Sequence, residues 1–154
     1  MAFVLLFLLG FVDGLRSLTA PAIVCWAAHL GWLHFAGTWF AFLDHRSTLM
    51  LLTLLAIIEL IIDKLPKTPA RTAPLGLIAR IVLGGGSGLA LATGAGISVP
   101  LAAVIAPIGA IAGAFAGYNV RRAAVLKAHL PGFVAAIAED AIAIAGGLLI
   151  VSHV

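Results

Sequence analysis

Several charged residues of this chain lie inside stretches that are otherwise apolar enough to cross a membrane. Four of the six carboxylates and two arginines are placed in this way: Asp13, Arg16, Glu59, Arg80, Glu139 and Asp140. A charge at the centre of a spanning helix costs on the order of 2.5–3.5 kcal/mol, so it is kept where it faces another charge, water or a ligand. Carboxylates and guanidinium groups in such positions bind ions, carry protons or pair with one another. This polar set is therefore the candidate site.

The acids in this set outnumber the arginines by four to two, so pairing alone leaves two carboxylates without a cation. Such a surplus requires a bound proton, a bound cation or water. Glu139 and Asp140 are adjacent, which separates them by about 100° around a helix and lets both line one polar sector. The set predicts proton coupling or cation binding rather than anion transport.

The spacing also predicts that these charges share one layer. At about 1.5 Å per helical residue, Glu59, Arg80 and Glu139 lie roughly 8–12 Å from the ends of their spans on one side of the membrane. Two interpretations of the layer remain open. In one, the arginines pair with the acids and fix the helix register; in the other, the charges line a route for an ion or solute.

A second group extends the set toward the end of a predicted span. Glu59 and Asp63 are four residues apart on one helix face, and Lys64 follows directly. This group is either a cluster paired with nearby basic residues or a cytoplasmic gate. With Asn119 near the end of a later span, the candidate polar pathway consists of Asp13, Arg16, Glu59, Asp63, Arg80, Asn119, Glu139 and Asp140.

The composition identifies the elements that position these residues. Hydrophobic residues make up 63% of the 154 residues and charged residues 10%, with a mean hydropathy of +1.20, as in an integral membrane protein. At about 20 residues per spanning helix, the chain holds four to six spans and no extramembrane domain. We predict an all-α polytopic membrane bundle, a single domain over 1–154, with about five spans in these segments: 3–33 (broken), 48–65, 75–97, 100–120 and 132–151.

The first apolar run is too long for one straight span. The sequence of this run predicts either two helical pieces with a break near Asp13 to Ser17 or one long kinked helix. Whether the run spans the membrane or re-enters on the same side also stays open. Thr19 is the expected N-cap of the second piece, and Ser47 that of the next span. The aromatic connection from His34 to Arg46 is expected at the bilayer surface.

Basic residues predict the orientation. The loops 64–71 and 121–127 hold six of the nine lysines and arginines, which places both on the cytoplasmic side of a bacterial inner membrane. The N-terminus is then cytoplasmic, or outside if the first run is a re-entrant hairpin. The proline-rich loop 64–71 is also expected to attract anionic lipid headgroups.

Gly109, Gly113 and Gly117 form a stripe of small residues that lets helix backbones touch, within the bundle or across a dimer interface. Because so small a bundle has few helices to line a route, we expect a homodimer. The expected partners are therefore the lipid bilayer, a second copy and a transported ion or small solute.

Other classes of function find no support in the residues. The five histidines have no metal or haem spacing, the single cysteine excludes an internal disulfide, and no catalytic nucleophile with its base is present. We expect no cofactor, no metal and no enzymatic activity, and the loops account for the net charge of +3 without nucleic acid. The alternatives to a transporter or channel are a membrane scaffold or accessory subunit and, less well supported, a lipid-modifying enzyme.

Three segments resemble a family of small bacterial polytopic membrane proteins, the domain of unknown function 4126. They are Gly14-Leu15-Arg16-Ser17-Leu18-Thr19, the proline-basic block from Asp63 to Pro74, and Arg80 followed by the glycines of 84–88. The resemblance covers most of the chain and implies a compact all-helical membrane fold. It implies no activity and no site residues.

Overall fold

The computed structural model describes the whole chain except residues 66–71, 128 and 130. The described part forms six α-helices and one short 3-10 helix: α1 (Ala2–Leu15), α2 (Thr19–His29), η1 (Ala41–Asp44), α3 (Arg46–Ile62), α4 (Pro74–Gly94), α5 (Val99–Leu126) and α6 (Gly132–Ser152). Proline stands in the first turn of α4 and of α5, where its fixed φ suits a helix start and its missing amide costs nothing. The predicted all-helical class is confirmed.

Three helices, α4, α5 and α6, are long and apolar enough to cross a membrane. The chain is thus a helical membrane protein. The structure does not confirm about five spans, because α3 has 17 residues and the first apolar run is divided into α1 and α2, of 14 and 11 residues. At 1.5 Å per residue, these three helices are shorter than the roughly 30 Å hydrocarbon layer.

The first run forms two helical pieces, as one of the two interpretations predicted. α1 ends at Leu15, Arg16 adopts an extended conformation with φ −143° and ψ 108°, and α2 begins at Thr19. The expected cap was wrong: Leu18 is the N-cap, and Thr19 is already in the helix. Ser47 is likewise inside α3, whose N-cap is His45. Neither hydroxyl caps its helix. For α2, a carboxylate on another helix accepts the free backbone amides before the first turn, as described below.

The helix that carries the predicted fourth span extends beyond residue 120. α5 continues through Arg121 and Arg122 to Leu126, which makes it 28 residues long. Arginine, alanine and leucine are good helix formers, so charge at this point marks the edge of the apolar layer without ending the helix.

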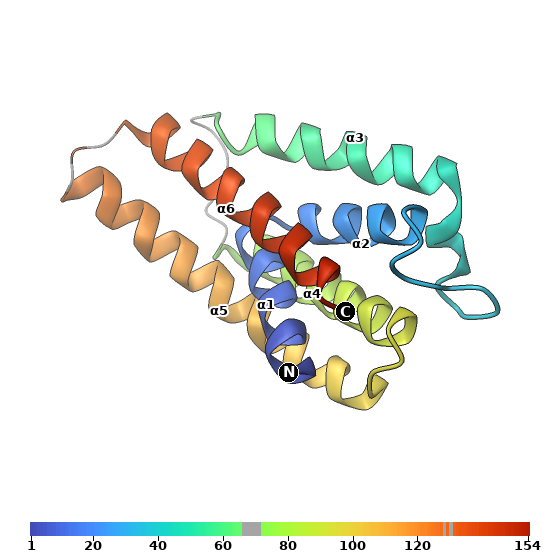
Figure 1. Ribbon diagram of the computed structural model, residues 1–154. Helices are drawn as coiled ribbons and strands as arrows, with labels where there is room; N and C mark the ends of the chain where they lie inside the picture. Colours follow the sequence, from blue (N-terminus) through green and yellow to red (C-terminus); the bar gives the residue numbers. More distant parts are fainter. Residues whose placement is uncertain (66–71, 128, 130) are drawn as a thin grey trace.

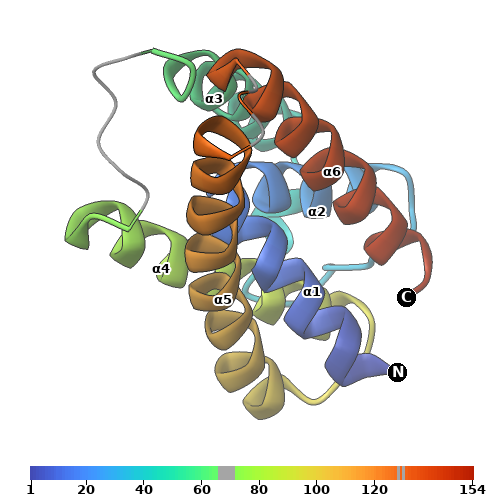
Figure 2. The ribbon, with the colours of Figure 1, turned by 90° about the vertical axis from the view of Figure 1, so that its left-hand side faces the viewer.

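The helix α1 runs along α5 through the middle of the molecule, with α4 against both (Figure 1, Figure 2). Glycines allow this close packing. A Cβ added at Gly10 or Gly14 would overlap the backbone of α5, and one added at Gly109 or Gly113 would overlap the carbonyl groups of Phe7 and Phe11. The predicted glycine stripe therefore packs within the chain at these positions, where helix backbones touch.

The helix α3 lies along the outside of the bundle, packed against α2 (Figure 1). Leu49 is the one buried residue among those of α3. The far ends of α3 and α5 lie at the same end of the molecule, on the left in Figure 1, in accord with the shared side predicted for the loops that follow them. The predictions for the proline-basic loop concern residues 66–71, which lie outside the described residues.

The aromatic connection before α3 is only partly exposed. Trp39 is 97% exposed, as expected of an interfacial ring, and Trp32 and Phe42 are also exposed. Phe35 departs from the prediction, because it is completely buried beside Gly94 at the end of α4. The absence of a side chain at Gly94 leaves room for the ring, so Phe35 joins the core instead of the bilayer surface.

Candidate functional site

The break between α1 and α2 places Arg16 at the centre of a charged cluster. The Arg16 side chain is fully buried, and it meets carboxylates from the end of α3 and from α6. Its Nε donates to Asp140 Oδ1 over 2.7 Å, its Nη1 pairs with Asp63, and its Nη2 lies 3.8 Å from Glu139 Oε2. The planar guanidinium has five donors in a fixed fork, which suits it to several carboxylates at once.

Lys64 is a second cation of this cluster and was not among the predicted pathway residues. Its Nζ pairs with Asp140 Oδ2 and also donates to the Leu60 carbonyl over 2.8 Å. Asp140 thus lies between Lys64 and Arg16, with one oxygen toward each. The signal that marks Lys64 is its position directly after Asp63, the C-cap of α3, where a lysine can fold back over the last turn.

Glu59 binds the backbone just before α2. Its carboxylate accepts the backbone amides of Ser17 and Leu18, each over 2.8 Å, and also the Ser17 hydroxyl. These amides precede the first turn of α2, where helix amides lack partners within the helix and the helix dipole is positive. Glu59 therefore caps α2 from another helix, which explains why Thr19 does not.

Arg80 occupies the opposite side of the same break. It is 6% exposed, and its Nε donates to the Gly14 carbonyl near the C-terminal end of α1 over 3.2 Å, while its Nη1 donates to the Gly76 carbonyl over 3.1 Å. The C-terminal end of a helix carries unsatisfied carbonyls and partial negative charge. Each half-helix end at the break is therefore matched by an opposite charge, Arg80 at α1 and Glu59 at α2.

Asp13 lies one turn before Arg16 and is completely buried. Among the described residues, neither of its carboxyl oxygens has a hydrogen-bond partner of ordinary geometry, and the same holds for the hydroxyl of Ser87 on α4. The carboxyl interacts with this hydroxyl and with the Arg80 guanidinium. Because Gly84 lacks a side chain, α4 comes close to Asp13 here: an added Cβ would lie 3.3 Å from the Asp13 Cβ.

The predicted pathway residues therefore divide into groups. Arg16, Asp63, Glu139 and Asp140 form one ion-pair cluster, while Glu59, Arg80 and Asp13 surround the helix break. Asn119 has no described contact with either group. It is exposed on α5, and its Nδ2 donates to the Phe115 carbonyl of its own helix over 2.9 Å.

The charge balance of this region keeps the predicted surplus of acids. Among the described residues of the cluster and the helix break, the five carboxylates are Asp13, Glu59, Asp63, Glu139 and Asp140, and the three cations are Arg16, Lys64 and Arg80, which is an excess of two acids. Adding Asp63 and Lys64 to the six charges first considered leaves this excess unchanged. Buried charge of one sign requires further compensation.

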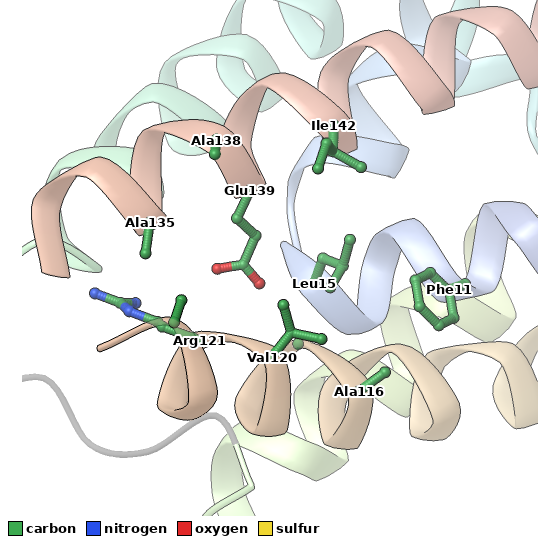
Figure 3. Close-up of a pocket in the computed structure, with 11 residues that line it drawn as sticks. Phe11, Leu15, Ala116, Val120, Arg121, Ala135, Ala138, Glu139 and Ile142 are labelled. Carbon is green, nitrogen blue, oxygen red and sulfur yellow. The ribbon is translucent and has the colours of Figure 1, made fainter. Parts of the chain in front are cut away.

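Glu139 also connects the cluster to a groove between α1, α5 and α6, with a volume of about 280 Å³ (Figure 3). Glu139 and Arg121 lie at one end of this groove, and the rest of the lining is apolar. Glu139 therefore belongs both to the ion-pair cluster and to the lining of this groove.

No protein-family model, curated protein or solved structure matches this chain.

Proposed function

We propose that this protein is a small membrane transporter or channel for an ion or small solute, coupled to protons through Asp13. The observation that carries the proposal is a completely buried carboxyl group beside a broken helix, whose oxygens lack hydrogen-bond partners among the described residues. An ionised carboxylate is costly in such a place, whereas its neutral form is tolerated. A group of this kind changes its protonation when its surroundings change, which is the property that proton coupling requires.

The helix break supports the proposal. Secondary transporters commonly bind substrates and coupling ions where helices are discontinuous, because the ends of half-helices carry free backbone groups and partial charges. Here both ends of the break lie within the bundle and are matched by Glu59 and Arg80. A change at Asp13, one turn from the break, would alter how α1 and α2 meet.

The cluster around Arg16 has the composition of a gate in this proposal. Arg16 and Lys64 both pair with Asp140, so an exchange of partners can separate α3 from α6 without leaving any of the charges isolated. The gate faces the end of the bundle where α3 and α5 end, which the positive-inside rule assigns to the cytoplasm of a bacterial cell. We further propose a homodimer, because three long helices in one copy are few for enclosing a route.

The test is flux into vesicles reconstituted with the purified protein and loaded with a pH-sensitive dye. The variant Asp13→Asn has nearly the same shape but cannot ionise, and its proton flux should fall to the level of protein-free vesicles. Asn119→Ala is the control, since Asn119 lies outside the cluster on the exposed face of α5; its flux should equal that of the wild type. Unchanged flux in Asp13→Asn, or wild-type flux no higher than in empty vesicles, would refute the proposal.

A membrane scaffold or accessory subunit is the second candidate, and the exposed side of α3 favours it. Met50, Leu54 and Ile61 are 66%, 55% and 59% exposed, and α3 buries Leu49 alone. A helix so weakly covered by its own chain has apolar surface available for a partner helix or for lipid. This candidate predicts no flux from the purified protein, together with a membrane protein that co-purifies with the wild type and is lost when Leu54 and Ile61 are replaced by serine.

A further inference from the structure

A second groove lies between α2, α4 and the connection that carries η1, with a volume of about 300 Å³. Ser87 of α4 is its one polar lining residue, so we call it the Ser87 groove. The other lining residues are apolar or glycine, and they include the rings of Phe40 and Phe42. Gly86 keeps the space open, because a Cβ added there would meet nothing within 4 Å.

The hydroxyl of Ser87 is not used by its own helix. A hydroxyl inside a helix commonly donates to the carbonyl four residues earlier. Thr53 and Thr93 do so, over 2.7 Å and 2.8 Å. Ser87 is 4% exposed, yet its Oγ has no hydrogen-bond partner of ordinary geometry among the described residues. Its hydroxyl therefore keeps its capacity to donate and to accept in the wall of the groove.

The buried carboxyl group of Asp13 lies next to this hydroxyl. The two groups interact, and a Cβ added at Gly84, one turn before Ser87, would lie 3.7 Å from Asp13 Oδ2. Arg80 acts on Asp13 electrostatically, but its Nε and Nη1 donate to backbone carbonyls. The groove therefore leads through one hydroxyl to one carboxyl group.

The Ser87 groove and the ion-pair cluster around Arg16 lie toward opposite ends of the bundle. The connection that carries η1 and the end of α4 lie on the right in Figure 1, whereas α3 and α5 end on the left. Ser87 is seven residues before the end of α4, which is about 10 Å along the helix. Asp13 therefore has the charged cluster on one side and the groove on the other.

We infer that the Ser87 groove binds a lipophilic amine, a primary ammonium group on an apolar body, which enters from the bilayer. The ammonium donates to Ser87 Oγ and to the Asp13 carboxylate, and the apolar body lies against the lining side chains. When the ammonium binds, the Asp13 carboxyl group releases its proton to water, so one proton leaves for each ammonium bound. The inference rests on the proposed function, whose substrate class it names, because proton and amine compete for one carboxyl group.

The charges and the lining disfavour other classes of ligand. An anion would meet a region with two more acids than bases, as counted above. A sugar or another polar neutral solute would lose its hydration to a wall with a single hydroxyl. A hard metal cation takes six or more oxygen ligands, far more than one hydroxyl and one carboxyl group supply. An ammonium on an apolar body suits both the carboxyl group and the apolar wall, and the rings of Phe40 and Phe42 also attract cations.

The test is equilibrium dialysis of the full chain in a mild detergent against radiolabelled 1-aminoadamantane, with protein-free micelles as the blank. The compounds 1-adamantanol and adamantane-1-carboxylate have the same apolar body, with a hydroxyl or a carboxylate in place of the ammonium. The wild type should bind one 1-aminoadamantane per chain. It should bind the other two at least about tenfold more weakly, since neither makes the charge-assisted hydrogen bond to Asp13.

Variants of the groove locate the binding. Asp13→Asn should weaken the binding of 1-aminoadamantane about tenfold, and Ser87→Ala should weaken it about fivefold. Ser152→Ala is the matched control for Ser87→Ala, because the Ser152 hydroxyl donates to the Leu149 carbonyl and lies outside the groove lining; it should bind like the wild type. Gly86→Leu should abolish binding by filling the groove.

The inference and the proposed function fail separately. A wild type that binds 1-adamantanol as tightly as 1-aminoadamantane, or equal binding by Ser87→Ala and Ser152→Ala, would overturn the inference. Proton flux without amine binding would also overturn it and leave the proposed function standing. Amine binding at this groove without proton flux would support the site and refute the transport.

Discussion

Removing the charge of Arg16 is the most informative perturbation of the cluster. Arg16→Met keeps an unbranched, flexible apolar side chain but removes the guanidinium that Asp63, Glu139 and Asp140 share, while the pair between Lys64 and Asp140 remains. Removing one partner from a buried ion pair commonly costs about 3–5 kcal/mol, because the other charge stays buried without compensation. The Arg16 side chain is 0% exposed and that of Asp140 is 11% exposed, so solvent screens this pair little. We therefore expect the free energy of unfolding to fall by about 3–5 kcal/mol.

A double-mutant cycle with Asp140 isolates the pair. Arg16 contacts Asp140 Oδ1 through two nitrogens, Nε at 2.7 Å and Nη2 at 2.6 Å, so this pair is joined at two points. Asp140→Asn alone leaves Arg16 with Asp63 and Glu139, so its cost should be smaller, about 1–3 kcal/mol. In the double variant both charges are absent, and its cost should be less than the sum of the single costs by about 1–3 kcal/mol.

The assay is reversible unfolding in mixed micelles with increasing denaturing detergent, followed by circular dichroism. Arg122→Met is the control for removing an arginine from an exposed helix position, and it should change the unfolding free energy by no more than about 0.5 kcal/mol. The reasoning is refuted if Arg16→Met costs as little as this control. It is also refuted if the two single costs add to the double cost within about 0.5 kcal/mol, since that means no coupling.

Two further predictions concern the helix contacts. Gly113→Ala should lower the unfolding free energy by about 1–3 kcal/mol, because the new Cβ overlaps the Phe11 carbonyl. Gly86→Ala should raise it by about 0.5–1 kcal/mol, because its new Cβ meets open space. Equal effects in the two variants would contradict the packing of α1 on α5. Glu59→Gln keeps the shape of the cap but removes its charge, so it should cost about 1–2 kcal/mol and speed hydrogen exchange at the Ser17 and Leu18 amides. Unchanged exchange at those two amides would show that Glu59 does not cap α2.

Residue types along the chain were sufficient to predict which segments are helical and where the first run breaks. Asp13, Gly14, Arg16 and Ser17 interrupt an apolar stretch, and the structure has its break at Arg16 to Leu18. The spacing along the chain also predicts that Glu59, Arg80 and Glu139, from three segments, lie at a similar depth. These features depend on local propensity and hydropathy, which are properties of neighbouring residues.

The contacts of individual polar residues could not be predicted, because position along a helix does not specify which neighbour a side chain meets. Asn119 was assigned to the pathway as a polar residue near the end of a span, and in the structure it is exposed on α5. Lys64 was left out because it follows a span, although its side chain folds back onto Asp140. Glu59 resembled a pathway acid, yet its position beside Ser17 makes it a cap.

The sequence by itself determined that this chain is a helical membrane protein and that its first apolar run is broken, and it predicted a layer of charged residues with an excess of acids. The tertiary structure alone decided the partners of each charge, the burial of Asp13 without hydrogen bonds among the described residues, and the groove between α5 and α6. The physical reason is that helix formation and membrane insertion follow from residues close in sequence. Ion pairs and cavities depend on which helix faces meet, and here glycines and alanines far apart in the chain set how closely they meet.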